Sequence, residues 1–507
     1  MLRAYSVQAV RAAEAALMAT LDDGGELMAR AAWGLAQVCR ARLRESGGTQ
    51  VVVLAGPGNN GADALYAAAH LADEGARCVA LQGSWPLAVG EAASWEAAGV
   101  RVIGADGDWA TALAEADLVL DGVLGIGGRP GLPSEACAWV DALPPDAYVV
   151  SVDLPSGQDP AGEVAQDSGV FADETVTFGV AKPVHVLPAT EPAVGRLTIV
   201  DIGLDLAGDP EVERLDHADV PKLWPVPNAG DDKYSRGVLG VVAGGEDYTG
   251  APVLCCTAAV GAGLGMLRYV GTPTPSGLVR AAVPEAVLGD GRVQAWVVGP
   301  GLDPTSRAKG SKAQLDVARA ALASDLPVLV DAGGLDLVMG RRAAPTLLTP
   351  HAGELARLLS RLDPHPATDR DEGRDRDEGR DRDGERDRAA VSRAQVQAAP
   401  LAHARRAAQL TGATVLLKGA TTLVVPPQGA VRSQTDAPAW TATAGAGDVL
   451  SGVCGALLAA GLSPLDAGSL GALVHGVAAD RANPGGPVRA LALAHAIPGT
   501  VAHLLTR

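Results

Sequence analysis

Aromatic and cysteine residues are scarce in this sequence of 507 residues, which has 8 Trp, 6 Tyr, 2 Phe and 6 Cys. The cysteines show no C-x-x-C spacing, and so few in so long a chain make a poor disulfide framework. We therefore expect a reducing, cytoplasmic location. No cluster of Lys and Arg stands against an apolar helix face, and the net charge is −18. This charge balance argues against nucleic acid and anionic membrane as partners.

Long apolar runs are missing as well. The N-terminus leads into a stretch with Glu14 rather than into an apolar signal region, and the longest uncharged apolar stretch with a helical pattern, residues 449–463, is too short to span a bilayer. We expect neither a secretion signal nor a membrane segment. With 48% hydrophobic and 20% charged residues, the chain is expected to be globular, and its length favours two domains.

Short apolar segments alternate with helical patterns along most of the chain. Residues 1–45 have helical spacing and are expected to serve in packing. Strands are then predicted at 51–54, 78–81, 118–120, 149–152 and 197–200, and a second series at 237–242, 295–298, 328–330, 346–348 and 415–417. Continuous apolar strands between helices predict parallel sheets covered on both faces, so both halves are expected to be α/β.

Two segments interrupt this pattern. Residues 207–230 are rich in proline and mark the expected boundary between a domain at 1–215 and one at 222–507. Residues 369–388 form an approximate hexapeptide repeat with 10 acidic and 7 basic side chains. We interpret the repeat as a solvated insertion without a role in activity.

The first glycine-rich motif follows the strand at 51–54 and reads GPGNNGAD over residues 56–63, with a helix expected from about Ala64. Such a turn directs backbone N–H groups at an anion. Its glycines also match the G-x-G-x-x-G of dinucleotide-redox domains, but no carboxylate lies at the expected place near Gln82. A tight glycine turn capped by asparagine is the remaining alternative.

Two further polar clusters, residues 121–129 and 153–157, begin with aspartates at the ends of apolar strands. Burying Asp121 or Asp153 is costly without a ligand, a cation or a hydrogen-bond partner. Because the ends of parallel strands form the ligand crevice, three such clusters on one sheet favour a binding site over three separate helix caps.

The motifs GPGNNGAD, DGVLGIGG, VDLPSG and TVTFGVAKP together resemble the NAD(P)H-hydrate epimerase domain, over about residues 1–215. The resemblance implies a Rossmann-like αβα sandwich that interconverts R- and S-hydrated NAD(P)H, with Asp153 as a catalytic residue at the nicotinamide ring and a bound potassium ion. The implied potassium ligands are Asn60, Asp121 and Ser156. The implied substrate contacts are Asp153, the segment Asn59, Asn60, Gly61, Ala62 and Asp63, and the segment Gly125, Ile126, Gly127, Gly128, Arg129, Pro130 and Gly131.

This sequence departs from the family at Ala62 and Ala64, where glycine is usual. If those positions need a positive φ, the epimerase is weakened. A non-catalytic nucleotide-binding module is therefore an alternative for this half.

The second glycine-rich loop, residues 443–448, opens an apolar helix. Its N–H groups suit a phosphate in transfer, and Asp448 is placed to take the proton from an attacking hydroxyl. A glycine turn with an aspartate cap is the alternative interpretation of that stretch alone. The segments 418–422 and 349–354 also follow strands and bring Lys418 and His351 toward the same sheet edge.

The segments KYSRGVLGVVAGGEDYTGA, GPGL, LTPHAGE, LKGATT and GAGDVLSG resemble the ADP-dependent (S)-NAD(P)H-hydrate dehydratases of the ribokinase-like superfamily, over roughly residues 222–507. The resemblance implies a second αβα domain in which ADP, with Mg²⁺, converts the substrate hydroxyl into a phosphate leaving group. Ala251, Gly301, His351 and the catalytic Asp448 would contact the hydrated cofactor. The nucleotide would be held by Lys418, Gly419, Ala420, Thr421, Thr422 and Gly447.

The two halves together imply a bifunctional repair enzyme that acts on the hydrates NADHX and NADPHX and consumes an adenine nucleotide. We expect a homo-oligomer. A small-molecule kinase of the same superfamily, for a sugar or a hydroxymethylpyrimidine, is the enzyme alternative, because its anion loop and aspartate look the same. No carboxylate pair in the sequence identifies the Mg²⁺ ligands.

Overall fold

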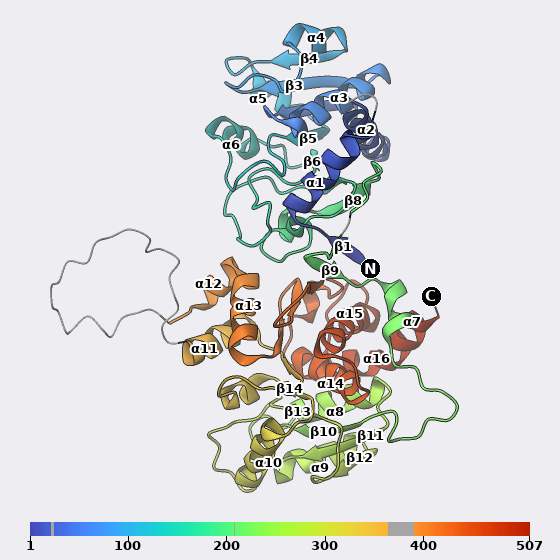
Figure 1. The fold of residues 1–507 in the computed structure, drawn as a ribbon, viewed down its shortest axis with the longest axis vertical. Helices are drawn as coiled ribbons and strands as arrows, with labels where there is room; N and C mark the ends of the chain where they lie inside the picture. Colours follow the sequence, from blue (N-terminus) through green and yellow to red (C-terminus); the bar gives the residue numbers. More distant parts are fainter. Residues whose placement is uncertain (22–24, 207, 364–389, 507) are drawn as a thin grey trace, which may run out of the picture. The chain divides into compact units, whose positions relative to one another are not determined.

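The computed structural model describes residues 1–21, 25–206, 208–363 and 390–506 (Figure 1). They divide into two compact units, one of residues Leu2–Glu213 and a larger one of Arg214–Arg507 that also takes Met1. The charged repeat at 369–388 lies outside the described residues. In the part of the chain that the model describes, no helix is long and apolar enough to cross a membrane.

The first unit is built on one parallel sheet with the strand order β4-β3-β2-β5-β6-β7-β8. The order reverses between β2 and β5, the arrangement that opens a ligand crevice at the carboxyl ends of these two strands. Its strands are β2 (Gln50–Ala55), β3 (Arg77–Gln82), β4 (Val100–Ile103), β5 (Leu118–Gly122), β6 (Tyr148–Val152), β7 (Glu174–Phe178) and β8 (Arg196–Val200).

Helices cover both faces of this sheet, as the continuous apolar strands predict. Residues of α2 and α3 join the alternate residues Val51 and Val53 of β2 in one core, whereas α5 and α6 join Val52 and Leu54 in the other. The predicted αβα class is therefore confirmed for this half. The elements are β1 (Leu2–Ala4), α1 (Val7–Met18), α2 (Glu26–Ser46), α3 (Asn59–Asp73), α4 (Ala92–Ala97), α5 (Trp109–Ala114) and α6 (Ser134–Asp141).

The second unit has a larger sheet that runs β18-β17-β16-β15-β14-β13-β10-β11-β12. The strands from β10 to β16 are parallel, and β17 and β18 are added as antiparallel hairpin strands. The order reverses between β10 and β13. The strands are β10 (Val238–Val242), β11 (Met266–Val270), β12 (Ala286–Leu288), β13 (Ala295–Val298), β14 (Val328–Val330), β15 (Thr346–Leu348), β16 (Thr414–Leu417), β17 (Thr422–Val425) and β18 (Val431–Gln434).

One large hydrophobic core joins this sheet to α8, α14, α15 and α16. The helices α10 and α13 contact the sheet at β13 and β16, respectively. This half too is α/β, as predicted. The strand β9 (Val212–Arg214) lies at the boundary of the units. The helices are α7 (Val220–Leu223), α8 (Ala251–Gly261), α9 (Pro273–Ala282), α10 (Ser311–Ala323), α11 (Ala352–Leu362), α12 (Arg393–Ala398), α13 (Pro400–Thr411), α14 (Ala446–Ala459), α15 (Pro464–Ala482) and α16 (Ala490–Leu505).

Candidate active sites

The three polar clusters of the first unit meet where the strand order reverses. Asn60, in the first turn of α3, donates hydrogen bonds from Nδ2 to the carbonyl oxygen of Leu124 at 3.1 Å and to that of Val152 at 2.6 Å. These bonds join the segment 59–63 to the turns after β5 and β6. A side chain at Gly125 would come within 2.2 Å of the Asn60 amide, so this approach requires glycine.

The helix α3 begins at Asn59, five positions before the predicted start at Ala64. Ala62 and Ala64 are therefore helical and fully buried. Among the non-glycine residues that the model describes, only Asp153 and Ala332 have a positive φ. The two alanines do not occupy a backbone conformation reserved for glycine, so the condition under which they would weaken the domain is not met.

The three residues implied as potassium ligands converge on the turn at Leu124. Asp121 is fully buried, and its Oδ2 accepts hydrogen bonds from Ser151 Oγ and from the Ser156 N–H, both at 2.8 Å. Ser156 Oγ accepts one from the Leu124 N–H at 2.8 Å. Burial raises the pKa of Asp121 above its ordinary value, although these hydrogen bonds oppose the rise. The donor set is thus one carboxylate with neutral oxygens, which suits a hard cation of low charge.

Asp153 follows β6 with φ +66° and forms a buried ion pair. Its Oδ1 accepts hydrogen bonds from Lys182 Nζ at 2.5 Å and from Thr177 Oγ1 at 2.9 Å. Burial alone would raise the pKa of Asp153, but the charge and hydrogen bond of Lys182 outweigh burial and hold it below the ordinary value. Asp153 is therefore ionised at neutral pH.

His185 fixes the backbone of Asp153. Its Nδ1 accepts the N–H of Lys182 at 3.0 Å, so its Nε2 carries the proton and donates it to the Asp153 carbonyl oxygen at 2.7 Å. Burial, with the charge of Lys182, lowers the pKa of His185 to about 4, so the ring is neutral. Lys182 belongs to the motif TVTFGVAKP but was not predicted as a site residue. The available signal was a lysine just beyond a strand that ends at the same sheet edge as Asp153.

Two more carboxylates lie at this site. Asp63 is 7% exposed, and burial raises its pKa well above the ordinary value, with further contributions from Asp153 and Glu14. Glu14 belongs to α1, and Arg11 of the same helix donates to the Ile126 carbonyl oxygen at 3.2 Å. The helix α1, expected only to pack, thus lies beside the implied substrate segment 125–131.

The crevice of the second unit lies at the carboxyl ends of β10 and β13, the neighbouring strands between which the order reverses. Gly301 follows β13 with φ +62°, and a side chain there would lie 2.8 Å from the Ala251 Cβ and 3.0 Å from the Tyr248 Cβ. Ala251 begins α8. The structure therefore brings together Ala251 and Gly301, two residues implied as substrate contacts.

Asp448 lies in the first turn of α14, which begins after Gly445 in the left-handed conformation at φ +92°. Burial, together with the negative charges of Asp331 and Glu354, raises the pKa of Asp448 to about 7, against the opposing charge of Lys418. A carboxylate with this pKa both accepts and releases a proton near neutral pH.

Lys418 follows β16, and its ammonium group lies close enough to Asp448 for their charges to interact. Its Nζ lies 2.8 Å from Asp331 Oδ1 and 3.8 Å from Glu354 Oε2. Asp331 is buried at the end of β14, and its Oδ2 accepts the Ser451 hydroxyl of α14 at 2.9 Å. Burial would lower the pKa of Lys418, but the charges of Asp331 and Glu354 raise it. Asp331 was not predicted as a site residue, although it follows an apolar strand directly, as Asp121 and Asp153 do.

His351 is the N-cap of α11. Its Nδ1 accepts the N–H groups of Gly353 at 3.1 Å and of Glu354 at 3.2 Å, so its Nε2 carries the proton, and burial lowers its pKa. The backbones of His351 and Lys418 pair in an isolated bridge. Gly419 and Ala420 are exposed in the turn before β17, Thr421 is buried, and Thr422 begins that strand. A side chain at Gly447 would come within 3.4 Å of Lys418 Nζ. The implied nucleotide residues therefore lie at one sheet edge.

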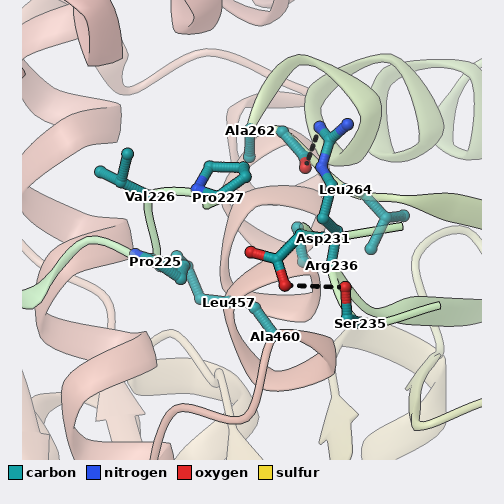
Figure 2. A pocket seen from close by; sticks show the side chains of 12 residues that line it. Pro225, Val226, Pro227, Asp231, Ser235, Arg236, Ala262, Leu264, Leu457 and Ala460 are labelled. Carbon is teal, nitrogen blue, oxygen red and sulfur yellow. Dashed lines mark hydrogen bonds between the residues drawn. The ribbon is translucent and has the colours of Figure 1, made fainter. Parts of the chain in front are cut away.

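A separate cavity of about 90 Å³ lies at the carboxyl-terminal ends of α8 and α14, away from the ends that carry Ala251 and Asp448 (Figure 2). Hydrogen bonds from Ser235 to Asp231 and from Arg236 to the Gly263 carbonyl oxygen close its sides. It is lined by Pro225, Val226, Pro227, Asp231, Ser235, Arg236, Ala262, Gly263, Leu264, Ala456, Leu457 and Ala460. Because Asp448 is at the beginning of α14 and Ala460 is just beyond its end, this cavity is not part of the crevice.

Each of the two α/β domains has acidic side chains and an ammonium group just after the carboxyl ends of its strands, and together they define a two-site enzyme of the nucleotide-binding type. Comparison with known proteins agrees. A family model described as YjeF-related protein N-terminus matches residues 24–184, and one described as NAD(P)H-hydrate dehydratase matches residues 239–498.

Relatives match both halves at once. The bifunctional NAD(P)H-hydrate repair enzyme Nnr of Mycobacterium leprae is 42% identical over 95% of this chain and 94% of its own length. The enzyme of the same name from Escherichia coli K12 is 30% identical over 90% of this chain and 84% of its own. Among solved structures, the ADP/ATP-dependent NAD(P)H-hydrate dehydratase of Bacillus subtilis is 22% identical, with a TM-score of 0.47, and covers 58% of this chain and 99% of its own. The chain belongs to the family of bifunctional NAD(P)H-hydrate repair enzymes.

Proposed function

We propose that each reaction of this family takes place at the crevice described for one unit. The first unit interconverts the R and S hydrates around Asp153 and Lys182. The second unit dehydrates the S form around Asp448 and Lys418, using ADP as the phosphoryl donor. The observation that carries this assignment is Asp448, a carboxylate with a pKa of about 7 in the first turn of α14 and beside an ammonium group.

In the second unit, Asp448 takes the proton of the substrate hydroxyl as the hydroxyl oxygen attacks the terminal phosphorus of ADP. The new O–P bond forms as the bond to the AMP leaving group breaks. Lys418 and the N–H groups at the start of α14 stabilise the charge of the transferred group. The substrate then loses phosphate as its carbon–oxygen bond breaks, and loss of a ring proton restores the dihydronicotinamide.

The substrate and nucleotide occupy neighbouring parts of this crevice. Support comes from the contact between Gly301 and Ala251 at the reversal between β10 and β13, and from the bridge between His351 and Lys418. We assign the hydrated cofactor to Ala251, Gly301, His351 and Asp448. The adenine nucleotide is assigned to Lys418, Gly419, Ala420, Thr421, Thr422 and Gly447.

The donors at this site fit a magnesium ion that is bound mainly through the nucleotide. The charges of Asp331 and Glu354 contribute to the raised pKa of Asp448, yet the described residues contain no group of three His, Cys, Asp or Glu side chains that could hold a metal ion. Mg²⁺ usually takes one or two carboxylates, several waters and substrate phosphates. We assign Glu354 as the carboxylate near the ion, and the ion would neutralise phosphate charge.

In the first unit, segments 59–63 and 125–131 hold the substrate, and Asp153 faces the nicotinamide ring. Asn60, Asp121 and Ser156 fit a potassium ion, because Asn60 and Ser156 both bond to Leu124 and Asp121 accepts the Ser156 N–H. Asp121 is also buried, and no cationic side chain among the described residues bonds to it. The bound cation would compensate the Asp121 charge and fix the turn between β5 and segment 125–131. Cytoplasmic location and homo-oligomer formation remain predictions.

One assay tests both assignments. The full-length protein is incubated with mixed R- and S-hydrated NADH, ADP, Mg²⁺ and K⁺, and recovery of dihydronicotinamide absorbance is followed, with a control lacking nucleotide. Complete conversion faster than spontaneous epimerisation is expected. Arrest once the S form is consumed would contradict the epimerase assignment. A stable phosphorylated product without recovered absorbance would instead support the kinase alternative.

A further inference from the structure

One carboxylate oxygen of Asp63 is buried without a hydrogen-bond partner in the described part of the chain. Its side chain is 7% exposed, and its Oδ1 has no partner among the residues that the structure describes. A charged oxygen in such a place is costly unless the group is protonated or meets a ligand. Asp63 lies one turn into α3, three residues after Asn60. Asn60 is bonded to Leu124, just after the strand of Asp121, and to Val152, the neighbour of Asp153.

The charges around Asp63 are predominantly negative. Asp153, after β6, and Glu14, on α1, both raise the pKa of Asp63 in addition to burial. The nearby ammonium of Lys182 is already bonded to Asp153, to Thr177 and to the Phe178 carbonyl oxygen. Asp153 is therefore the ionised member of the set and Asp63 the protonated one, because carboxylates that share one site do not all ionise together.

We propose that Asp63 is the general acid of the epimerase, donating its proton to the hydroxyl of the hydrated ring carbon, and that Asp153 is the base that receives the proton of the returning water. This inference rests on the proposed assignment of epimerisation to the first unit. Asp63, which the family resemblance implies only as one of several substrate contacts, is thereby given a catalytic role. Glu14 is a positioning residue, since it acts on Asp63 through its charge.

The reaction balances with water as the only other reactant. The proton of Asp63 passes to the hydroxyl oxygen, the carbon–oxygen bond breaks, and the electron pair of the ring nitrogen forms a double bond to that carbon as water leaves. Water then adds to the opposite face of the same carbon, one of its protons passes to Asp153, and the electron pair returns to nitrogen. Proton exchange with solvent restores protonated Asp63 and ionised Asp153.

This route predicts exchange of the hydroxyl oxygen with solvent. The competing route opens the ring between nitrogen and the hydrated carbon and closes it again, which keeps the original oxygen. The first route needs an acid for the departing hydroxyl and a base for the added water, and Asp63 and Asp153 have these protonation states. The oxygen label distinguishes it from the second.

The experiment uses full-length protein and S-hydrated NADH without nucleotide, so that the second unit does not consume the substrate. Formation of the R form is followed by chromatography in water labelled with heavy oxygen, and the spontaneous rate is subtracted. Asp63→Asn is compared with Glu14→Gln and with Glu96→Gln, an exposed carboxylate of α4 that serves as the matched control. Nucleotide-dependent dehydration and the thermal unfolding of each variant report on folding.

We expect Asp63→Asn to lower kcat about 10²-fold or more with little change in KM. Glu14→Gln should move the alkaline limb of the pH profile to lower pH, because removing a negative charge favours ionisation of Asp63. Glu96→Gln should behave as the wild type, and each epimerisation should introduce one labelled oxygen.

Two results would overturn the inference: a wild-type rate and pH profile in Asp63→Asn, or epimerisation that retains the unlabelled oxygen. If Asp63→Asn does not fold, an unmoved alkaline limb in Glu14→Gln has the same meaning. An unmodified protein that does not accelerate epimerisation would overturn the proposed function itself, and the inference with it. The two failures are thus distinguishable.

Discussion

Lys418 and Asp331 form an ion pair of 2.8 Å across the ends of β16 and β14, two strands that have β15 between them. The second oxygen of Asp331 accepts the Ser451 hydroxyl from α14. This arrangement fixes the ammonium group relative to the helix whose first turn carries Asp448. It also keeps a negative charge near Asp448, which contributes to the elevated pKa of that group.

Replacing Asp448 with Asn should abolish nucleotide-dependent dehydration and leave epimerisation unchanged. The amide cannot take the proton of the attacking hydroxyl, and general acid–base catalysis is worth about 10²–10⁴-fold. Both activities are measured on the same preparation, dehydration by absorbance and epimerisation by chromatography without nucleotide. Dehydration at the wild-type rate would remove Asp448 from the mechanism.

The kcat/KM of dehydration should fall as the pH decreases through about 7, because Asp448 must be ionised to act as a base. Asp331→Asn should move this midpoint to lower pH, since it removes a negative charge that raises the pKa of Asp448. Ser451→Ala is the matched control, because it removes a hydrogen bond to Asp331 but leaves its charge. Identical midpoints in the wild type and Asp331→Asn would contradict this explanation.

Replacing Lys182 with Met should destabilise the first unit by about 3–5 kcal/mol, because Asp153 is left as an unpaired buried charge. Adding Asp153→Asn should restore part of the loss. The pKa of Asp153 is held below its ordinary value in the folded protein, so the stability from this pair is present above about pH 4 and is lost below it. The wild type and Lys182→Met should therefore converge in urea unfolding as the pH falls, and a constant difference would refute the assignment.

Exchanging potassium for choline should slow epimerisation without affecting dehydration of the S form in the same sample. Asp121→Asn should raise the potassium concentration needed for half-maximal epimerisation, because it removes the carboxylate of the proposed ligand set. Ionic strength is kept constant throughout. Equal epimerisation rates in the two salts would show that Asn60, Asp121 and Ser156 stabilise the fold and do not bind a potassium ion needed for activity.

Ala62→Gly, which introduces the residue usual in the family, should not increase epimerisation. Ala62 is helical and fully buried, so glycine should instead lower the free energy of unfolding by about 1 kcal/mol through its greater backbone entropy. Thermal unfolding and the epimerisation rate are compared with those of the wild type. A clear gain in rate would mean that the methyl group obstructs the substrate.

Local patterns in the sequence determined the α/β class of both halves, most strands of the first sheet and about half of those in the second. Runs such as Val51–Leu54 and Val328–Val330 are apolar at every position, which only a sheet covered on both faces accommodates. Shorter or more polar strands such as β11 and β18 were not predicted, because Arg268 and Arg432 break the apolar pattern. The glycine motifs also located the ends of the strands that form both crevices.

Only the tertiary structure decided which polar side chains share a site. Lys182 and Asp153 are far apart in sequence, as are Lys418 and Asp331, and their pairing follows from strand order, which no local pattern encodes. Glu14 joins the first site only because α1 lies beside segment 125–131. Because α3 already begins at Asn59, Ala62 is helical and does not need the positive φ that would require glycine. Residue types and spacing are local properties, whereas burial and the charges that set a pKa depend on the whole fold.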